Sequence, residues 1–139
     1  MLDHVGIRCC DFARSLSFFQ QALAPLGISV VMQVSAAQTG DHDHAGFGRT
    51  GKPDLWIGNA PGAHRGVHIA FSAASRADVD AFHRAALAAG GTDNGAPGIR
   101  EHYHPDYYGA FVLDPDGNNI EAVYHGEAKQ SAPHVRVTF

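Results

Sequence analysis

Residues 108–125 read Tyr-Gly-Ala-Phe-Val-Leu-Asp-Pro-Asp-Gly-Asn-Asn-Ile-Glu-Ala-Val-Tyr-His, two short apolar runs around a polar centre. The centre, residues 114–118, has Pro second and Gly fourth, which favours a type I turn between two paired strands. In the second strand, alternation places Glu121 on the same face as Val123 and His125. A carboxylate is unusual at mid-strand, and burying it requires a cation or strong hydrogen-bond donors. Glu121 is therefore the first candidate functional residue.

The composition indicates a soluble globular domain. The 139 residues are 45% hydrophobic and 17% charged, which is ordinary for a chain with one core. A net charge of -4 with no Lys/Arg run argues against nucleic acid or an anionic membrane as partner. No apolar run approaches the roughly 18 residues of a membrane helix, and no signal-peptide pattern opens the chain. Cys9 and Cys10 are adjacent and would point to opposite faces of a strand, which disfavours a disulfide and fits a reducing cytoplasm.

The pattern of the first residues repeats 64 positions later. Residues 2–10 alternate, with a polar face that begins at His4, and residues 67–72 alternate in the same way around His68. A helix signal follows each strand: an N-cap at Asp11, and a capping box that begins at Ser75. Six identical residues align in this one register: His4 with His68, Phe18 with Phe82, Ala22 with Ala86, Leu23 with Leu87, Ala24 with Ala88 and Gly27 with Gly91. The repetition predicts two similar structural modules.

We place the module boundaries from the repeat and the linker composition. Module one spans residues 1–60 and module two spans residues 66–125, each a strand, a helix and further strands within one domain. Residues 36–51 are polar and Gly-rich and are expected to form a loop or a ragged strand. A C-terminal tail covers residues 126–139, and its end, residues 134–139, either adds an edge strand or stays loose.

Three residues of this repeat can bind a metal. His4 and His68 lie on the polar faces of the two first strands, and Glu121 lies on the last strong strand. If the modules pair about a pseudo-twofold axis, two imidazoles and one carboxylate converge on a divalent cation and leave coordination positions open. In the alternative interpretation, the histidines are ordinary polar residues and the glutamate pairs with an arginine. Because all three sit in the register of the repeat, we favour the metal. Ten histidines in the chain agree with this choice.

The His4 strand, its His68 counterpart and the Asp114-Pro-Asp-Gly-Asn turn before Ile-Glu121 resemble the vicinal oxygen chelate superfamily, over residues 2–125. This superfamily includes glyoxalase I, extradiol dioxygenases and bleomycin-resistance proteins. The resemblance implies an α+β fold of two tandem βαβββ modules that form a curved, mostly antiparallel sheet cup with helices outside. It also implies a divalent metal such as Fe(II), Mn(II) or Zn(II) on His4, His68 and Glu121. A homodimer is expected, with the cup within one chain or shared by two.

One departure from the family pattern bears on the reaction. Glyoxalase I takes a fourth ligand from the last strand of module one, where this chain has Leu55-Trp56-Ile57, and none of these side chains can ligate a metal. The remaining set looks more like that of extradiol dioxygenases and fosfomycin thiol transferases. We therefore expect a metal-dependent enzyme acting on a small substrate with two neighbouring oxygens. The alternative is a metal-free protein that sequesters a small molecule, as bleomycin-resistance proteins do; nothing in the sequence supports a relic scaffold.

Residues 102–108 are dense in titratable and aromatic groups and lead directly into the Glu121 hairpin. As a lid, this segment would place His104 or Tyr108 within reach of a substrate as the catalytic acid or base. The alternative is a surface loop whose rings cover the hairpin.

Three further residues are candidates for substrate binding, each with a structural alternative. Arg8 could hold a substrate carboxylate or form an internal ion pair. Trp56 could stack on an apolar substrate or belong to the core. His125 shares the face of Glu121 and could orient a ligand or simply be polar at the rim. The segment His42-Asp43-His44 is expected to be solvated or to capture metal adventitiously.

Overall fold

The computed structural model describes residues 2–126, so the expectation for residues 134–139 and nearly all of the tail lies outside the described residues. The elements of module one are β1 (Val5–Arg8), α1 (Phe12–Leu23), the 3₁₀ turn η1 (Ala24–Leu26), β2 (Ser29–Val34), α2 (Ala36–Thr39), β3 (His44–Gly48) and β4 (Leu55–Gly58). Those of module two are β5 (His68–Ser72), α3 (Arg76–Ala88), β6 (Thr92–Ile99), β7 (Tyr108–Leu113) and β8 (Asn119–Tyr124). No helix in this described part is long and apolar enough to cross a membrane.

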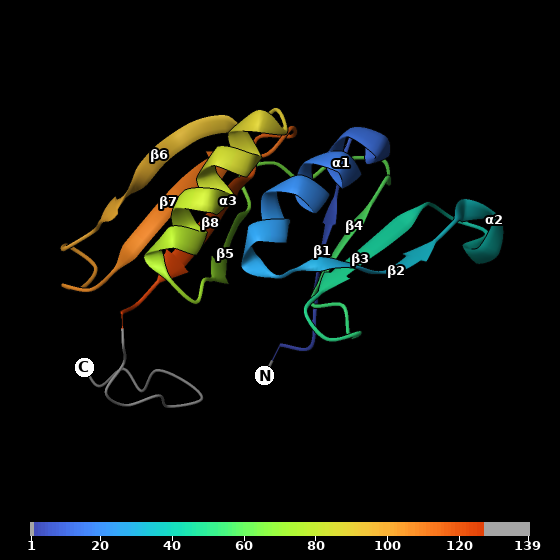
Figure 1. Ribbon diagram of the computed structural model, residues 1–139. Helices are drawn as coiled ribbons and strands as arrows, with labels where there is room; N and C mark the ends of the chain where they lie inside the picture. Colours follow the sequence, from blue (N-terminus) through green and yellow to red (C-terminus); the bar gives the residue numbers. More distant parts are fainter. Residues whose placement is uncertain (1, 127–139) are drawn as a thin grey trace.

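The two modules have the same topology, which confirms the repeat (Figure 1). Each forms an open four-stranded sheet, with strand orders β1-β4-β3-β2 and β5-β8-β7-β6. The first strand pairs in parallel with the last strand in each module, and all other pairs are antiparallel. The chain thus has the expected α+β fold of two βαβββ modules.

The helix boundaries follow from the capping residues. The Asp11 side chain accepts a hydrogen bond from the backbone N–H of Arg14 at 3.0 Å, and Ser75 accepts one from the N–H of Asp78 at 3.2 Å. Gly27 ends the first helical segment with a φ of 70°, a left-handed conformation that glycine adopts at low cost. These contacts confirm the predicted starts of both main helices.

The structure differs from the sequence-based expectation at residues 36–51. Residues 36–51 contain the short helix α2 and the strand β3 in place of a loop or ragged strand, because the Asp43 carboxylate accepts from the N–H of Ala36 at 2.8 Å and holds this turn. The strand β6 is one of the further strands that the repeat predicts for module two. Its pairing with β7 is irregular near Gly95 and Gly98, which interrupts the alternation that marks a strand.

One hydrophobic core joins the modules on the helix side. Figure 1 shows α1 and α3 side by side, each in front of its own sheet. Phe18 and Phe19 of α1 and Phe82 of α3 are fully buried in this core. On the other face of the edge strands β1 and β5, side chains such as Arg8 and His68 are exposed. Arg8 and His68, two of the candidate site residues, therefore lie on this exposed face.

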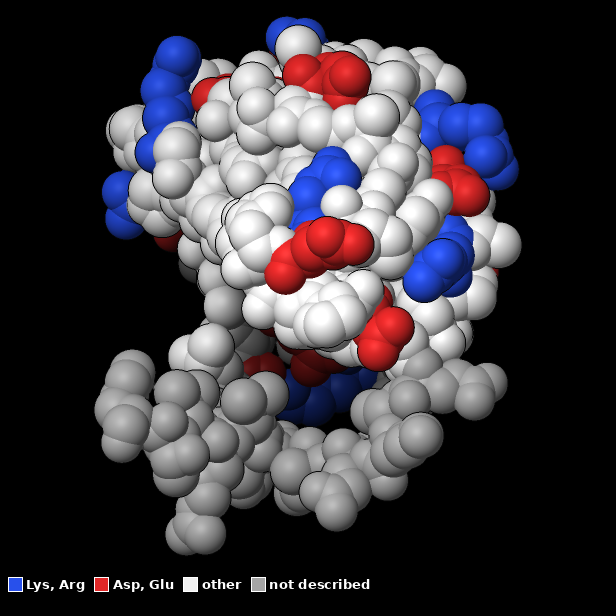
Figure 2. All heavy atoms as spheres, turned by 90° about the vertical axis from the view of Figure 1, so that its left-hand side faces the viewer, with Lys and Arg blue, Asp and Glu red and all other residues white. Residues whose placement is uncertain are grey.

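The surface charge is mixed where it can be seen. On the face shown in Figure 2, acidic and basic side chains are interspersed without a continuous patch of one sign. Such a face offers no extended cationic surface for a polyanion.

Candidate functional site

Glu121 lies in β8 and is almost completely buried, with 1% exposure. Its Cα partners are Phe111 on β7 and Ala70 on β5, so its side chain projects from the middle of the sheet. The Tyr107 hydroxyl donates to Oε1 at 2.5 Å, and Nε2 of His68 lies 3.2 Å from Oε2. Each carboxylate oxygen therefore has one partner, and no Lys or Arg among the described residues forms an ion pair with it.

Tyr107 stays protonated in this arrangement. Burial of its ring and its hydrogen bond to Glu121 raise the pKa of Tyr107 well above its usual range. Gly109 leaves the space for this contact, because a Cβ there would stand 3.0 Å from Oε1 of Glu121 and 3.1 Å from the Tyr107 ring. Tyr107 is thus a permanent hydrogen-bond donor that fixes the carboxylate.

Asn119 holds the ring of His68. Nδ1 of His68 lies 3.2 Å from the backbone oxygen of Asn119 and 2.9 Å from its side-chain amide nitrogen. The carbonyl can accept from a protonated Nδ1, and the amide can donate to an unprotonated one. The ring also stacks on Phe111 with its centroid at 6.3 Å. With the proton on Nε2, His68 donates toward Glu121; with the proton on Nδ1, bonded to the Asn119 carbonyl, the lone pair of Nε2 is free, which is the form that a metal ligand requires.

His4 lies apart from this pair. It is exposed, and its Nδ1 is 2.8 Å from an Asp3 carboxylate oxygen. Within residues 2–126, no group of three or more His, Cys, Asp or Glu residues is arranged to hold a metal ion. The structure therefore brings His68 and Glu121 together and does not add His4 to them.

A second cluster lies beside Tyr107. Nε2 of His104 is 2.8 Å from Nδ1 of His125, and the Tyr107 ring packs edge-on against both imidazoles. The backbone N–H of Asp106 donates to Nδ1 of His104 at 3.2 Å, so the His104 proton resides on Nε2 and is donated to His125. This leaves Nε2 of His125 as the ring nitrogen without a protein partner among the described residues.

Tyr108, the tyrosine that the sequence analysis selects as a candidate acid or base, lies on the helix side of the sheet. Its hydroxyl donates to a carboxylate oxygen of Asp80 on α3 at 2.8 Å, and this bond together with burial raises its pKa. The tyrosine beside Glu121 is Tyr107, which the sequence reasoning missed. A signal for it existed: pairing across the 114–118 turn sets Phe111 opposite Glu121, and counting back by twos reaches Tyr107.

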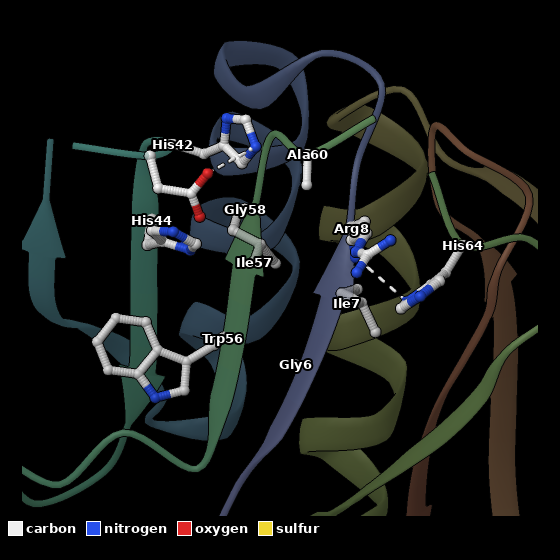
Figure 3. Close-up of a pocket in the computed structure, with 11 residues that line it drawn as sticks. Gly6, Ile7, Arg8, His42, His44, Trp56, Ile57, Gly58, Ala60 and His64 are labelled. Atoms are coloured by element: carbon white, nitrogen blue, oxygen red, sulfur yellow. Dashed lines mark hydrogen bonds and ion pairs between the residues drawn. The ribbon is translucent and has the colours of Figure 1, made fainter. Parts of the chain in front are cut away.

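Module one carries an open pocket of about 350 Å³ on the equivalent sheet face (Figure 3). The substrate-binding candidates Arg8 and Trp56 both line it, while His125 belongs to the other module. Trp56 pairs with Gly6 as Glu121 pairs with Ala70, so the tryptophan occupies the position that is the carboxylate in module two. The missing fourth ligand is therefore replaced by an aromatic ring that is half-buried rather than part of the core.

Comparisons with known proteins agree on the kind of protein. The family model described as the Glyoxalase/Bleomycin resistance protein/Dioxygenase superfamily matches residues 1–122. A sequence comparison with curated proteins gives no match.

Solved structures with similar folds cover most of the chain. A glyoxalase/bleomycin resistance protein from Albidiferax ferrireducens T118 is 29% identical, with a TM-score of 0.72, over 88% of this chain and 96% of that one. A glyoxalase/bleomycin resistance protein/dioxygenase family enzyme from Burkholderia phytofirmans PsJN is 22% identical, with a TM-score of 0.64, over 89% and 98%. An E144Q mutant of glyoxalase I from Zea mays is 20% identical, with a TM-score of 0.68, over 88% of this chain and 46% of that one.

Proposed function

Because this chain belongs to the Glyoxalase/Bleomycin resistance protein/Dioxygenase superfamily, we propose that it is a divalent-metal-dependent enzyme acting on a small substrate with two neighbouring oxygens. The observation that carries the proposal is the buried Glu121 carboxylate with His68 beside it. A buried carboxylate without a cationic side chain is stable when a metal ion supplies the missing charge. Cys9 and Cys10 are free thiols, which suits a reducing cytoplasm as its location.

His68 and Glu121 would hold the cation from one chain. The Asn119 carbonyl would orient the imidazole, and the Tyr107 hydroxyl holds one carboxylate oxygen while the other lies beside His68. When bound, a divalent cation such as Fe(II), Mn(II) or Zn(II) would polarise the two substrate oxygens that it chelates.

We assign the third donor to His4 of a second copy. In this chain His4 is exposed at the start of the edge strand β1, away from His68 and Glu121. In a twofold dimer, β1 of each copy can lie over module two of the other, and symmetry makes the same contact twice. Such a dimer would also cover the edges of β1 and β5.

The His104–His125 pair is the proposed proton-transfer group. In the tautomer that His104 fixes, Nδ1 of His125 accepts and Nε2 carries the proton, so Nε2 can supply a proton to the substrate while Nδ1 takes the proton of His104. His104 thereby acts as a positioning residue in this proposal, and His125 as the group that meets the substrate. Tyr108 has no part in it because its hydroxyl is bonded to Asp80 on the helix side.

Metal titration tests the proposal. Metal-free wild type, Glu121→Gln, His68→Ala and His4→Ala are titrated with Mn(II) and Zn(II) by calorimetry. Each variant should bind at least about tenfold more weakly, since each loses a charge or a nitrogen ligand. His83→Gln is the control, because His83 pairs with Asp93 and should leave affinity unchanged. Equal affinity in all five proteins would remove the metal site and favour a metal-free binding protein.

A further inference from the structure

The pocket on module one contains groups that the proposed metal site does not use. From their arrangement we infer that this pocket binds a flat aromatic carboxylate, with the ring against Trp56 and the carboxylate on Arg8. The inference rests on the proposed function, because the pocket lies on the sheet face that begins with His4. It names the substrate class for that function.

The indole of Trp56 is fixed by close packing on the neighbouring strand β3. Its ring lies over the backbone of Gly46, where a Cβ would stand 3.1 Å from two carbons of the benzo ring. A Cβ at Gly46 would also be 2.6 Å from that of Pro53, so only glycine admits the indole at this depth. The ring is nevertheless half-buried and lines the pocket. A fixed, partly exposed indole is a stacking surface for another planar ring.

The floor beside Trp56 is open. A Cβ added to Gly6 would meet nothing within 4 Å, and Gly6 lies between Trp56 and the side chain of Arg8 on this face (Figure 3). At Gly58, the next floor position, the His44 imidazole lies across the backbone, and a Cβ there would stand 2.5 Å from its Nδ1. The pocket of about 350 Å³ is at the small end of ligand sites and suits one ring or two fused rings.

Arg8 and His64 make one end of the pocket a donor site. The guanidinium of Arg8 is exposed, and its contact with the carbonyl of Pro61 is long at 3.5 Å. No carboxylate within residues 2–126 forms an ion pair with Arg8. The Arg8 backbone N–H donates to Nδ1 of His64 at 3.3 Å, so the His64 proton is on Nε2 and is available to a ligand. A permanent cation beside a neutral donor fits a carboxylate.

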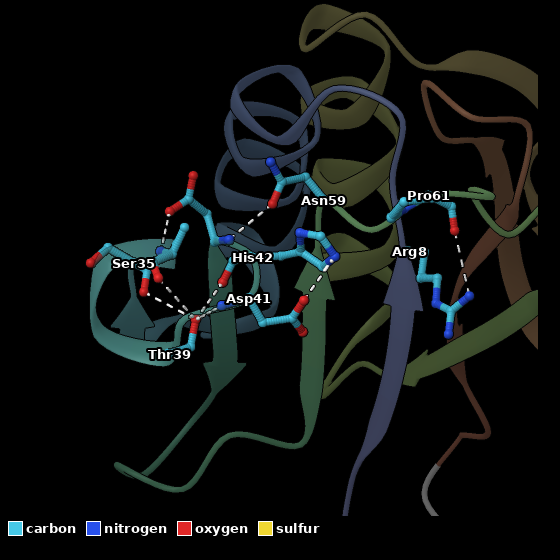
Figure 4. Close-up of polar contacts among 9 residues, drawn as sticks. Arg8, Ser35, Thr39, Asp41, His42, Asn59 and Pro61 are labelled. Carbon is cyan, nitrogen blue, oxygen red and sulfur yellow. Dashed lines mark hydrogen bonds and ion pairs between the residues drawn. The ribbon is translucent and has the colours of Figure 1, made fainter.

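The opposite rim of the pocket carries an acidic side chain, which disfavours a bound anion. Asp41 lies there with one oxygen 2.9 Å from Nε2 of His42, and Figure 4 shows this pair across the sheet from Arg8. Thr39 braces the turn, since its hydroxyl donates to the carbonyl of His42 and accepts from the N–H of Asp41, both at 3.2 Å. The Asp41 carboxylate at this rim and the Arg8 guanidinium at the other make the two ends of the pocket opposite in charge. The anionic end of a ligand should therefore lie at Arg8.

The test uses the metal-free full-length protein and sodium 2-naphthoate. Trp56 is the only tryptophan, so a ¹H–¹⁵N spectrum contains one indole N–H signal, which reports directly on the pocket. Titration with 2-naphthoate should shift this signal through the ring current of the stacked ligand. Cyclohexanecarboxylate carries the charge without the aromatic rings, and 2-naphthalenemethanol carries the aromatic rings without the charge. Both should bind at least about tenfold more weakly than 2-naphthoate.

Two substitutions assign the contacts. Arg8→Gln should weaken 2-naphthoate at least about tenfold and leave 2-naphthalenemethanol unchanged, because only the former uses the guanidinium. Arg65→Gln is the matched control, since Arg65 is a cation of the same linker as His64 and does not line the pocket. Glu121→Gln should bind 2-naphthoate as wild type does, so that loss of the metal site and loss of this pocket are told apart.

Three results would overturn the inference: no shift of the indole signal with 2-naphthoate, equal affinities for 2-naphthoate and its neutral alcohol, or undiminished binding by Arg8→Gln. The first two are measured on wild type and so do not depend on any variant folding. A metal titration that succeeds together with any of these results would leave the proposed function standing and reject only the substrate class.

Discussion

The buried carboxylate of Glu121 contacts two side chains that come from different parts of module two. His68 comes from the first strand of the module, and Tyr107 comes from the residue just before β7. Their contacts give the carboxylate one hydrogen bond, from Tyr107, and a neighbouring imidazole, but no counter-charge from Lys or Arg among residues 2–126. A hydroxyl that hydrogen-bonds to a metal-binding carboxylate, as that of Tyr107 would, affects how tightly the carboxylate binds a cation.

Tyr107→Phe tests that effect. Removing the hydroxyl leaves Oε1 of Glu121 buried without its donor, which should cost about 1–3 kcal/mol of folding free energy. Metal affinity should fall roughly tenfold to a hundredfold, because the carboxylate loses its fixed orientation. Urea denaturation and metal calorimetry measure the two quantities.

Tyr108→Phe is the matched control. It removes a hydroxyl that bonds to Asp80 on the helix side, so it should leave metal affinity at the wild-type value. A larger loss of affinity in Tyr108→Phe than in Tyr107→Phe would show that the sequence-based choice of Tyr108 was the better one.

At the scale of the elements, the helix α3 is the element that contacts both modules. It packs on its own sheet and against α1 and η1 of the other module. The chain leaves α3 through Gly91, where a Cβ would meet the Val112 side chain at 2.5 Å, the Phe18 ring at 2.8 Å and the carbonyl of Ala86 at 2.9 Å. This close approach of strand, helix and partner helix requires glycine for space.

Gly91→Ala should therefore destabilise the fold. Its methyl group would force fully buried side chains to shift, at a cost of about 1–3 kcal/mol in the free energy of unfolding by urea. Gly6→Ala is the control, because its Cβ would meet nothing within 4 Å and alanine stiffens the unfolded chain. Equal stability of the two variants would contradict the close packing at Gly91.

At the scale of the whole molecule, each module presents its own exposed sheet face. The face of module two holds His68 and Glu121, and the face of module one holds His4 and the Trp56 pocket. The complete metal site proposed above combines the two faces. A direct mixing experiment tests the proposal that the two faces come from two copies.

In that experiment, His4→Ala and Glu121→Gln proteins are unfolded together and refolded as mixed dimers. If the sites are shared between copies, each mixed dimer contains one site with both substitutions and one intact site. Half of the refolded dimers are mixed, so tight metal binding should return at about a quarter of the wild-type stoichiometry. If each site lies within one chain, every site keeps one defect and no tight binding returns. Sedimentation at micromolar concentration checks the dimer itself, and a strictly monomeric profile would contradict the shared site.

The repeat, the capping residues and the Glu121 hairpin could be predicted from the sequence because each depends on local rules. Alternation, turn composition and N-cap chemistry act over a few residues, so strand, helix and turn positions follow from neighbours along the chain. The repeat and the strand faces led to His4, His68 and Glu121, and the resemblance added the family. Of these, the closeness of His68 and Glu121 is now seen, and the role of His4 stays a prediction.

Only the tertiary structure decided which groups meet across strands. His68 reaches Glu121, and Tyr108 turns to Asp80, because the pairing of β5 with β8 and the packing of α3 on β7 bring together residues that are far apart along the chain. In the same way, Trp56 became the counterpart of Glu121 only once β4 was paired with β1. A one-residue change of register would exchange the faces, and local sequence preferences cannot decide between partners that lie tens of residues apart.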